Sequence, residues 1–133
     1  MVKVVTYILE NNATIQGLVG NKEQEQTEDY HKIYPVVAPQ SEVAPYCVVR
    51  LASRARAGKG CSDNFGVQVI SYAKSYDEVT TLNEAVISVI EAQTSGTVNG
   101  MAFSFLNMTN ESDDFVKENM LYAKITTFEG MAE

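Results

Sequence analysis

The residues from Val67 to Ala92 constrain the fold most, because a strand pattern runs directly into an amphipathic helix pattern. Over residues 67–73 the side chains alternate with the period of a strand, one set being Val67, Val69, Ser71 and Ala73 and the other Gln68, Ile70 and Tyr72. Ser75 and Glu78 have the spacing of a capping box, so the helix is predicted to begin at Tyr76. Its apolar residues recur every three or four positions and form one stripe: Val79, Leu82, Val86, Val89 and Ile90. This stripe has to be buried, and the sheet that the strand joins is the nearest surface.

Length and composition fit one globular domain. The chain has 133 residues, of which 45% are hydrophobic and 20% are charged. No apolar run approaches the about 20 residues of a membrane-spanning helix. The beginning of the sequence, Met1-Val2-Lys3-Val4, lacks the pattern of a secretory signal. We therefore expect a single domain over residues 1–133, held in a cytoplasm and without a membrane partner.

The net charge of −7 argues against a general nucleic-acid-binding surface, which needs clustered lysine and arginine. Cys47 and Cys61 are the only cysteines, and His31 is the only histidine. Two cysteines cannot form a four-ligand metal site by themselves, and His31 is far from both in the sequence. We expect free thiols, no disulfide, no metal site and no cofactor.

The other segments predict a mixed fold. A short helix is expected over residues 2–10, followed by a helical turn or two that Thr14 caps. Strands are expected over residues 46–51, 101–108 and 121–128, with the polar stretch 110–114 linking the last two as an antiparallel pair. The expected class is α+β, with a largely antiparallel sheet of four to five strands and two main helices packed on it.

The motifs that could carry catalysis are incomplete. His31 has no nucleophile or orienting acid beside it in a recognisable motif. Glu111, Asp113 and Asp114 could hold a cation, but the spacing of a calcium loop is absent, so a solvated hairpin turn is favoured. Gly58-Lys59-Gly60 fails the pattern of a phosphate-binding loop. We expect no enzymatic activity.

Three basic residues fall within a short stretch of this acidic chain: Arg54, Arg56 and Lys59. They lie in a predicted loop over residues 53–64. A flexible basic loop can simply be solvated, or it can contact an acidic neighbour or passing nucleic acid. These three residues are the candidate interaction site.

Three groups of short motifs follow one another along the chain, and their order is similar to that in one family of proteins. Ile33-Tyr34-Pro35, Ala38-Pro39-Gln40 and Ala44-Pro45-Tyr46 come first; Val67-Gln68-Val69 with Ala73 and Ser75-Tyr76-Asp77-Glu78 follow; Phe103 and Tyr122 with Thr126-Thr127-Phe128 close the series. In this order they resemble the small tail-completion (tail-terminator, head–tail joining) proteins of long-tailed bacteriophages and prophages. The resemblance extends from about Val4 to Phe128.

The resemblance implies a protomer that assembles as a ring, commonly a hexamer, at the head-proximal end of the tail. Such a ring stops polymerisation of the tail-tube protein and presents a surface to the head connector, and DNA passes through it without sequence recognition. The family has no catalytic residues to carry over. Its members assemble in the host cytoplasm and end in the virion tail. The loop between the second pair of strands often takes part in assembly, which points to residues 53–64 here.

The chain departs from this family pattern between Gly20 and Ile33, where an acidic stretch is inserted. A rival hypothesis from another class is a small ligand-binding or regulatory α+β domain without catalysis. Neighbouring genes for portal, capsid and tail-tube proteins would favour the tail-completion hypothesis over the rival hypothesis.

Overall fold

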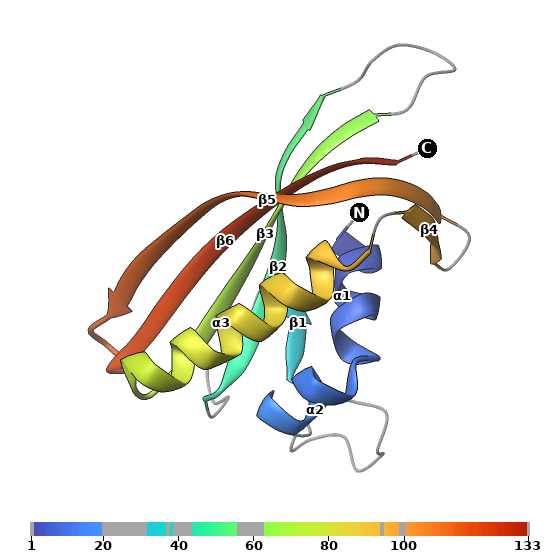
Figure 1. The fold of residues 1–133 in the computed structure, drawn as a ribbon. Coiled ribbons are helices and arrows are strands. Elements are labelled where there is room, and N and C mark those ends of the chain that lie inside the picture. Colours follow the sequence, from blue (N-terminus) through green and yellow to red (C-terminus); the bar gives the residue numbers. More distant parts are fainter. Residues whose placement is uncertain are drawn as a thin grey trace.

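The computed structural model describes residues 2–19, 32–36, 38, 44–55, 63–93, 95–98 and 101–132. Three helices and six strands follow one another along the chain (Figure 1): α1 (Val2–Glu10), α2 (Ala13–Val19), β1 (Ile33–Pro35), β2 (Tyr46–Ala55), β3 (Asp63–Ala73), α3 (Tyr76–Glu91), β4 (Ser95–Val98), β5 (Met101–Val116) and β6 (Leu121–Ala132). The predicted α+β class is confirmed.

The sheet is larger than the sequence predicted, with six strands in the order β1-β2-β3-β6-β5-β4. Every neighbouring pair is antiparallel except β1 and β2, which are parallel, so the sheet is mixed. The expected four to five strands did not include both edge strands, β1 and β4, and α2 was expected only as a helical turn or two. These elements have three, four and seven residues, too few for a clear apolar period.

The helix α3 begins where the sequence predicted. Ser75 has the extended backbone of an N-cap, with φ −131° and ψ 156°. Its hydroxyl oxygen accepts a hydrogen bond of 3.2 Å from the backbone N–H of Glu78. This bond satisfies one of the free donors of the first turn, while Asp77 and Glu78 face the positive end of the helix dipole.

The helix α2 begins two residues earlier than expected. Asn12, and not Thr14, is its cap: the Asn12 side-chain oxygen accepts hydrogen bonds from the backbone N–H groups of Thr14 at 3.0 Å and Ile15 at 3.2 Å. With Asn12 as the N-cap, these two donors belong to the second and third residues of the helix, which a capping side chain normally satisfies. The prediction that Thr14 caps this helix is therefore wrong.

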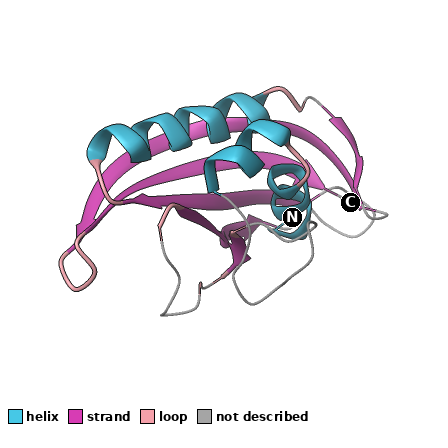
Figure 2. Ribbon diagram, turned by 90° about the horizontal axis from the view of Figure 1, so that it is seen from below, coloured by secondary structure: helices cyan, strands magenta, loops and turns pink. Residues whose placement is uncertain are grey.

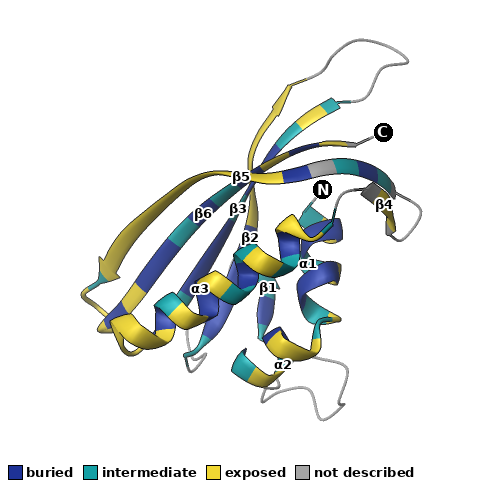
Figure 3. Cartoon of the chain, in the orientation of Figure 1, coloured by how far each residue is buried: buried dark blue, intermediate teal, exposed yellow. Residues whose placement is uncertain are grey.

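All three helices gather on one face of the sheet, as Figure 2 shows, and the main core lies between them and the strands. Leu82 and Val86, from the middle of the predicted stripe, are 1% and 0% exposed. Phe128 is the largest fully buried side chain, and it comes from the strand below α3. The burial of the α3 stripe against the sheet is thus confirmed (Figure 3).

The opposite face of the sheet carries a second apolar cluster. Tyr46 and Val48 on β2 alternate with the core residues of that strand and pair across the sheet with Tyr72 and Ile70 on β3. The rings of Tyr46 and Tyr72 stack with centroids 4.8 Å apart. Ala38 packs on this cluster from the chain that follows β1, so this end of the sheet buries apolar surface on both faces.

The last two strands differ most from expectation. Residues 110–114, predicted as a polar link, lie inside β5, and the turn instead comprises residues 117–120. These polar residues alternate on a strand whose two faces both meet solvent, so they have no apolar period that would mark a strand. The predicted antiparallel pairing of the last two strands is confirmed, with bulges after Ser104 and Met108.

Candidate interaction surfaces

The first surface lies at the open end of the β2–β3 hairpin, where the sequence placed a basic loop. Arg54 is the last but one residue of β2 and therefore lies in a strand, because β2 continues to Ala55 and β3 already begins at Asp63. The predicted loop over residues 53–64 is too long at both ends. Arg56 and Lys59 lie outside the described residues.

The Arg54 side chain is held by two neighbours on β3. Its Nε and Nη2 atoms donate to the Asp63 Oδ2 atom at 3.0 Å and 2.5 Å. Its guanidinium carbon lies 5.3 Å from the centre of the Phe65 ring. The side chain nevertheless remains 50% exposed. Arg54 thus joins the ends of the two strands and still presents N–H donors to solvent.

Arg50 is a second cation on β2, which the sequence analysis did not select. Its Nε atom donates to the Gln68 side-chain oxygen at 2.8 Å. Within the part of the chain that the structure describes, it forms no ion pair with a carboxylate. Because Gln68 is neutral, it orients the guanidinium without cancelling its charge. The signal in the sequence was a lone arginine in an otherwise apolar strand pattern.

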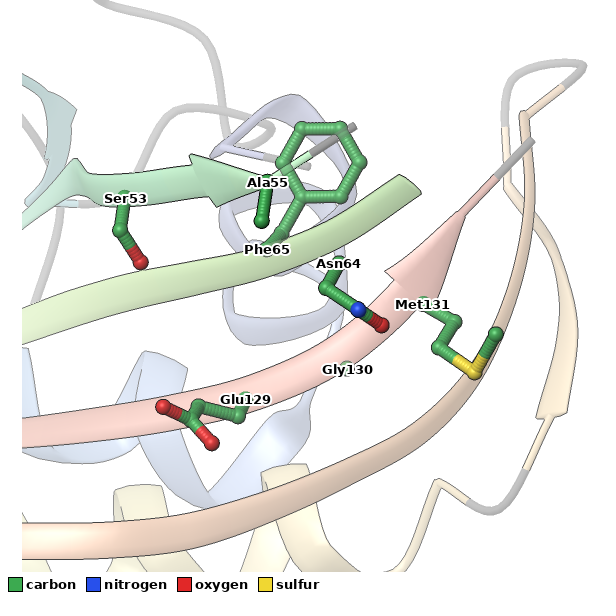
Figure 4. A pocket seen from close by; sticks show the side chains of 7 residues that line it. All are labelled: Ser53, Ala55, Asn64, Phe65, Glu129, Gly130 and Met131. Carbon is green, nitrogen blue, oxygen red and sulfur yellow. The ribbon is translucent and has the colours of Figure 1, made fainter. Parts of the chain in front are cut away.

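A hollow lies between β2, β3 and β6 near this end of the sheet (Figure 4). Its volume is about 440 Å³, and its lining comprises Ser53, Ala55, Asn64, Phe65, Glu129, Gly130 and Met131. Glu129 is the one titratable side chain among them. Such a lining can receive a side chain of a partner, but it has no pair of acid–base groups aimed at a common point.

The second surface is centred on Lys124, at the turn end of the β5–β6 hairpin. The lysine side chain is only 8% exposed. Its ammonium nitrogen lies 2.8 Å from the Asp113 carboxylate, 3.3 Å from the Glu111 carboxylate and 3.3 Å from the Tyr76 hydroxyl. The Tyr76 hydroxyl is also hydrogen bonded to the second Asp113 oxygen at 3.0 Å. The cluster joins β5, β6 and the first residue of α3.

These contacts change the protonation equilibria of both charged partners. The hydrogen bond to Asp113, together with those to Tyr76 and Glu111, raises the pKa of Lys124 above its usual range, although burial acts in the opposite direction. The hydrogen bonds from Lys124 and Tyr76 lower the pKa of Asp113. Both groups are therefore charged at neutral pH, and the pair is a fixed ionic link between the hairpin and α3.

The acidic residues of this hairpin were expected in a solvated turn rather than in a cation site. They lie on a strand instead, and the cation beside Asp113 and Glu111 is the lysine of the chain itself. Within the described residues, no group of three or more His, Cys, Asp or Glu is placed to hold a metal ion. Lys124 could have been found from the sequence, because a turn at residues 117–120 sets it opposite Asp113.

Exposed aromatic side chains surround this ionic cluster. Phe115 and Tyr122 contact edge to face, with ring centroids 4.9 Å apart, and Tyr76 meets Tyr122 in the same way at 6.1 Å. The three rings are 38%, 37% and 47% exposed, and Met120 in the turn is 67% exposed. We call these four residues the hairpin-end patch. Apolar side chains this exposed and this close together are typical of contact surfaces.

A third polar group is fully enclosed between α3 and the sheet. The Asn83 side-chain oxygen accepts hydrogen bonds from the hydroxyls of Ser71 at 3.3 Å and Thr126 at 3.0 Å. The Cys47 sulfur lies 3.7 Å from the Ser71 hydroxyl, and burial raises the pKa of this thiol to about 12. Cys47 therefore stays protonated at neutral pH and is no nucleophile. Cys61 lies outside the described residues.

Comparison with known structures finds similarities of fold, and one of them is to a chain of a virion. A chain in the structure described as the virion of a native gene transfer agent (GTA) particle superposes with a TM-score of 0.73 at 14% sequence identity. The match covers 97% of the present chain and 91% of the other. No family model and no curated protein matches the sequence. The shared feature is the α+β fold over nearly the whole length of both chains.

Proposed function

We propose that this protein is a structural component of a phage-like virion, and more specifically a tail-completion protein. The observation that carries the proposal is the fold shared with a chain of the gene transfer agent virion, which spans 97% of this chain. The order of sequence motifs, which resembles that of tail-completion proteins, supports the same proposal independently.

In this role the chain forms a ring, commonly a hexamer in the family that it resembles, at the head-proximal end of the tail. The ring stops polymerisation of the tail-tube protein and meets the head connector. The protein acts without catalysis; it assembles in the host cytoplasm and stays in the virion tail. Among the described helices, none has the length and apolar character needed to span a membrane.

The negative net charge of the protein suits a channel through which DNA passes without binding to the wall. With a net charge of −7 per chain, a ring would on balance repel a phosphate backbone. The basic residues Arg54, Arg56 and Lys59 are then the proposed contact with an acidic neighbouring subunit or with the passing DNA. Arg54 pairs with Asp63, but its own side chain is 50% exposed, so it can still contact a neighbouring subunit or DNA.

Deletion of the gene from its parent particle tests the function. We expect tails of abnormal length or heads without tails in electron micrographs, and rescue by the wild-type gene supplied in trans. Normal tails joined to filled heads in the deletion strain would rule the role out. Rescue by the double variant Arg54→Glu, Arg56→Glu would keep the role and remove these residues from it.

A further inference from the structure

Two strands of the sheet have outer edges that are only partly paired. β1 pairs with β2 only at Cys47, Val48 and Val49, and β4 pairs with β5 only over residues 101–104. Within the described chain, residues 50–55 of β2 and residues 105–116 of β5 have no strand on their outer side. In the sheet, β3 and β6 separate these two strands.

The two segments carry opposite charges. β2 contains two arginines and no acidic residue, whereas β5 contains Glu111, Asp113 and Asp114 and no basic residue. On each strand one charge lacks an ionic partner among the described residues: Arg50 on β2 and Asp114 on β5. The sheet register places both of these side chains on the face opposite the helices.

Each charged segment also has exposed apolar surface beside it. Leu51 follows Arg50 and is 48% exposed, and Phe115 of the hairpin-end patch follows Asp114. The register turns Leu51 and Phe115 to the helix face, so charge and apolar surface lie on the two sides of each strand. The Lys124 cluster fixes the patch against α3, so little side-chain freedom remains to be lost when a partner binds. Fixed aromatic side chains beside a charge are the usual centres of protein–protein interfaces.

The contact uses side chains rather than an added strand. The backbone N–H of Met108 donates to the Glu91 carboxylate at 3.3 Å, and that of Phe115 donates to the Asp114 side chain at 2.8 Å. Carboxylates therefore occupy two N–H donors of β5 that a new strand would need. This protection of the edge makes indefinite strand-to-strand growth unfavourable while leaving the side chains accessible.

Among the described residues Arg50 and Asp114 form no ion pair with each other, although the charges of both act on Tyr72 of β3, which lies between them. β3 and β6 lie between β2 and β5, which places the two strands about 14 Å apart at the usual spacing of strands. We propose that the β5 end of one copy, with Asp114 and the hairpin-end patch, docks on the β2 end of a second copy, with Arg50 and Leu51. Such a contact joins two different surfaces, so each added copy presents one free surface of each kind, and the series closes as a ring or grows as a fibre.

This inference rests on the proposed function, because it names the surfaces by which the proposed ring would form. Charge reversal at these surfaces tests the contact separately from the function. We expect Arg50→Glu and Asp114→Arg, each alone, to weaken self-association about tenfold or more, because each brings like charges together. The double variant restores opposite charges across the contact, so it should regain most of the association. Native mass spectrometry and sedimentation velocity of the purified full chain measure the distribution of oligomers.

Matched controls reverse charges elsewhere on the surface. Lys3→Glu on α1 and Glu84→Arg on α3 reverse the charge of an exposed residue, as the test variants do. Both control proteins should associate like the wild type. Phe115→Ser should weaken association without any change of charge. Circular dichroism and urea unfolding at low protein concentration show that each variant is folded.

Three results would overturn the inference: a wild-type protein that stays monomeric at about 100 µM, single variants that associate normally, or a double variant that is not restored. The deletion experiment separates this outcome from the proposed function. If deletion abolishes tail joining but Arg50→Glu still forms rings, the function stands and the surface is wrong. If the charge swap restores association but deletion leaves normal particles, the surface stands and the function is wrong.

Discussion

The two halves of β5 have similar backbones and opposite environments. In its first half Phe103 and Leu106 are 5% and 1% exposed and pack in the core under the helices. In its second half every residue from Asn107 to Phe115 is exposed (Figure 3). One strand thus contributes first to the stability of the chain and then to its accessible surface. Substitutions in the two halves should therefore separate folding from association.

The largest effect is expected in the buried half. Leu106→Ala should lower the free energy of unfolding by about 2–5 kcal/mol, because it removes a fully enclosed side chain and leaves a cavity. Leu82→Ala on α3 should cost a similar amount from the other side of the same core. Urea titration at low protein concentration measures both. A loss under about 0.5 kcal/mol would mean that these side chains face a subunit contact instead of the core.

An intermediate effect is expected at the ionic cluster. Lys124→Met keeps the apolar stem but removes the ammonium group that the Asp113 and Glu111 carboxylates and the Tyr76 hydroxyl contact. We expect a loss of about 1–3 kcal/mol in unfolding free energy, the range for hydrogen bonds to charged groups. The matched control Lys74→Met, at an exposed lysine, should change little. Equal values for the two variants would show that the cluster does not stabilise the chain.

The same cluster predicts a pH dependence. The pKa of Asp113 is lower in the folded chain than in the unfolded one, so its contribution is present above about pH 4 and is lost as the pH falls through the folded-state pKa. The pKa of Lys124 is raised, so its contribution persists up to the unfolded-state value of 10.5 and is lost only at higher pH. The difference in stability between the wild type and Asp113→Asn should therefore be constant from about pH 5 to pH 9 and shrink towards pH 2. A difference that stays constant into acid would contradict the pairing.

The smallest effect on folding is expected in the exposed half. Phe115→Ser should change the unfolding free energy of the monomer by less than about 1 kcal/mol, because the ring already meets solvent over more than a third of its surface. Its effect should appear instead as a lower stability of the oligomer, measured by the dependence of the unfolding midpoint on protein concentration. A large loss of unfolding free energy in the monomer would show that Phe115 belongs to the core and not to the interface.

The sequence predicted the parts of the fold whose side chains have a clear period. The stripe of α3 and the Ser75 cap follow from local rules, and both are confirmed. The outer half of β5 was missed because its polar residues meet solvent on both faces, so no alternation distinguishes the strand from a loop. β1 and β4 are fixed by their neighbours in the sheet and not by their own few residues.

The candidate site was predicted less well than the fold, for a related reason. Arg54, Arg56 and Lys59 were selected because they are close in sequence, and the structure describes only Arg54, paired with Asp63 across a hairpin. The Lys124 cluster combines residues of three separate elements, so it depends on the register of the β5–β6 hairpin and on where α3 begins. Asn83 gave a weaker signal as a polar residue between the apolar positions of the α3 stripe, and its partners Ser71 and Thr126 come from two strands.

The position of β6 in the sheet has a consequence for synthesis on the ribosome. Among the described strands β6 is made last, yet it lies in the middle, between β3 and β5. Until β6 joins the sheet, the strands β1-β2-β3 and the strands β5-β4 have no pairing that connects them. The Lys124 cluster and the hairpin-end patch also require β6, since Lys124 and Tyr122 belong to it. A copy in which β6 has not yet joined the sheet would consequently lack the proposed docking surface.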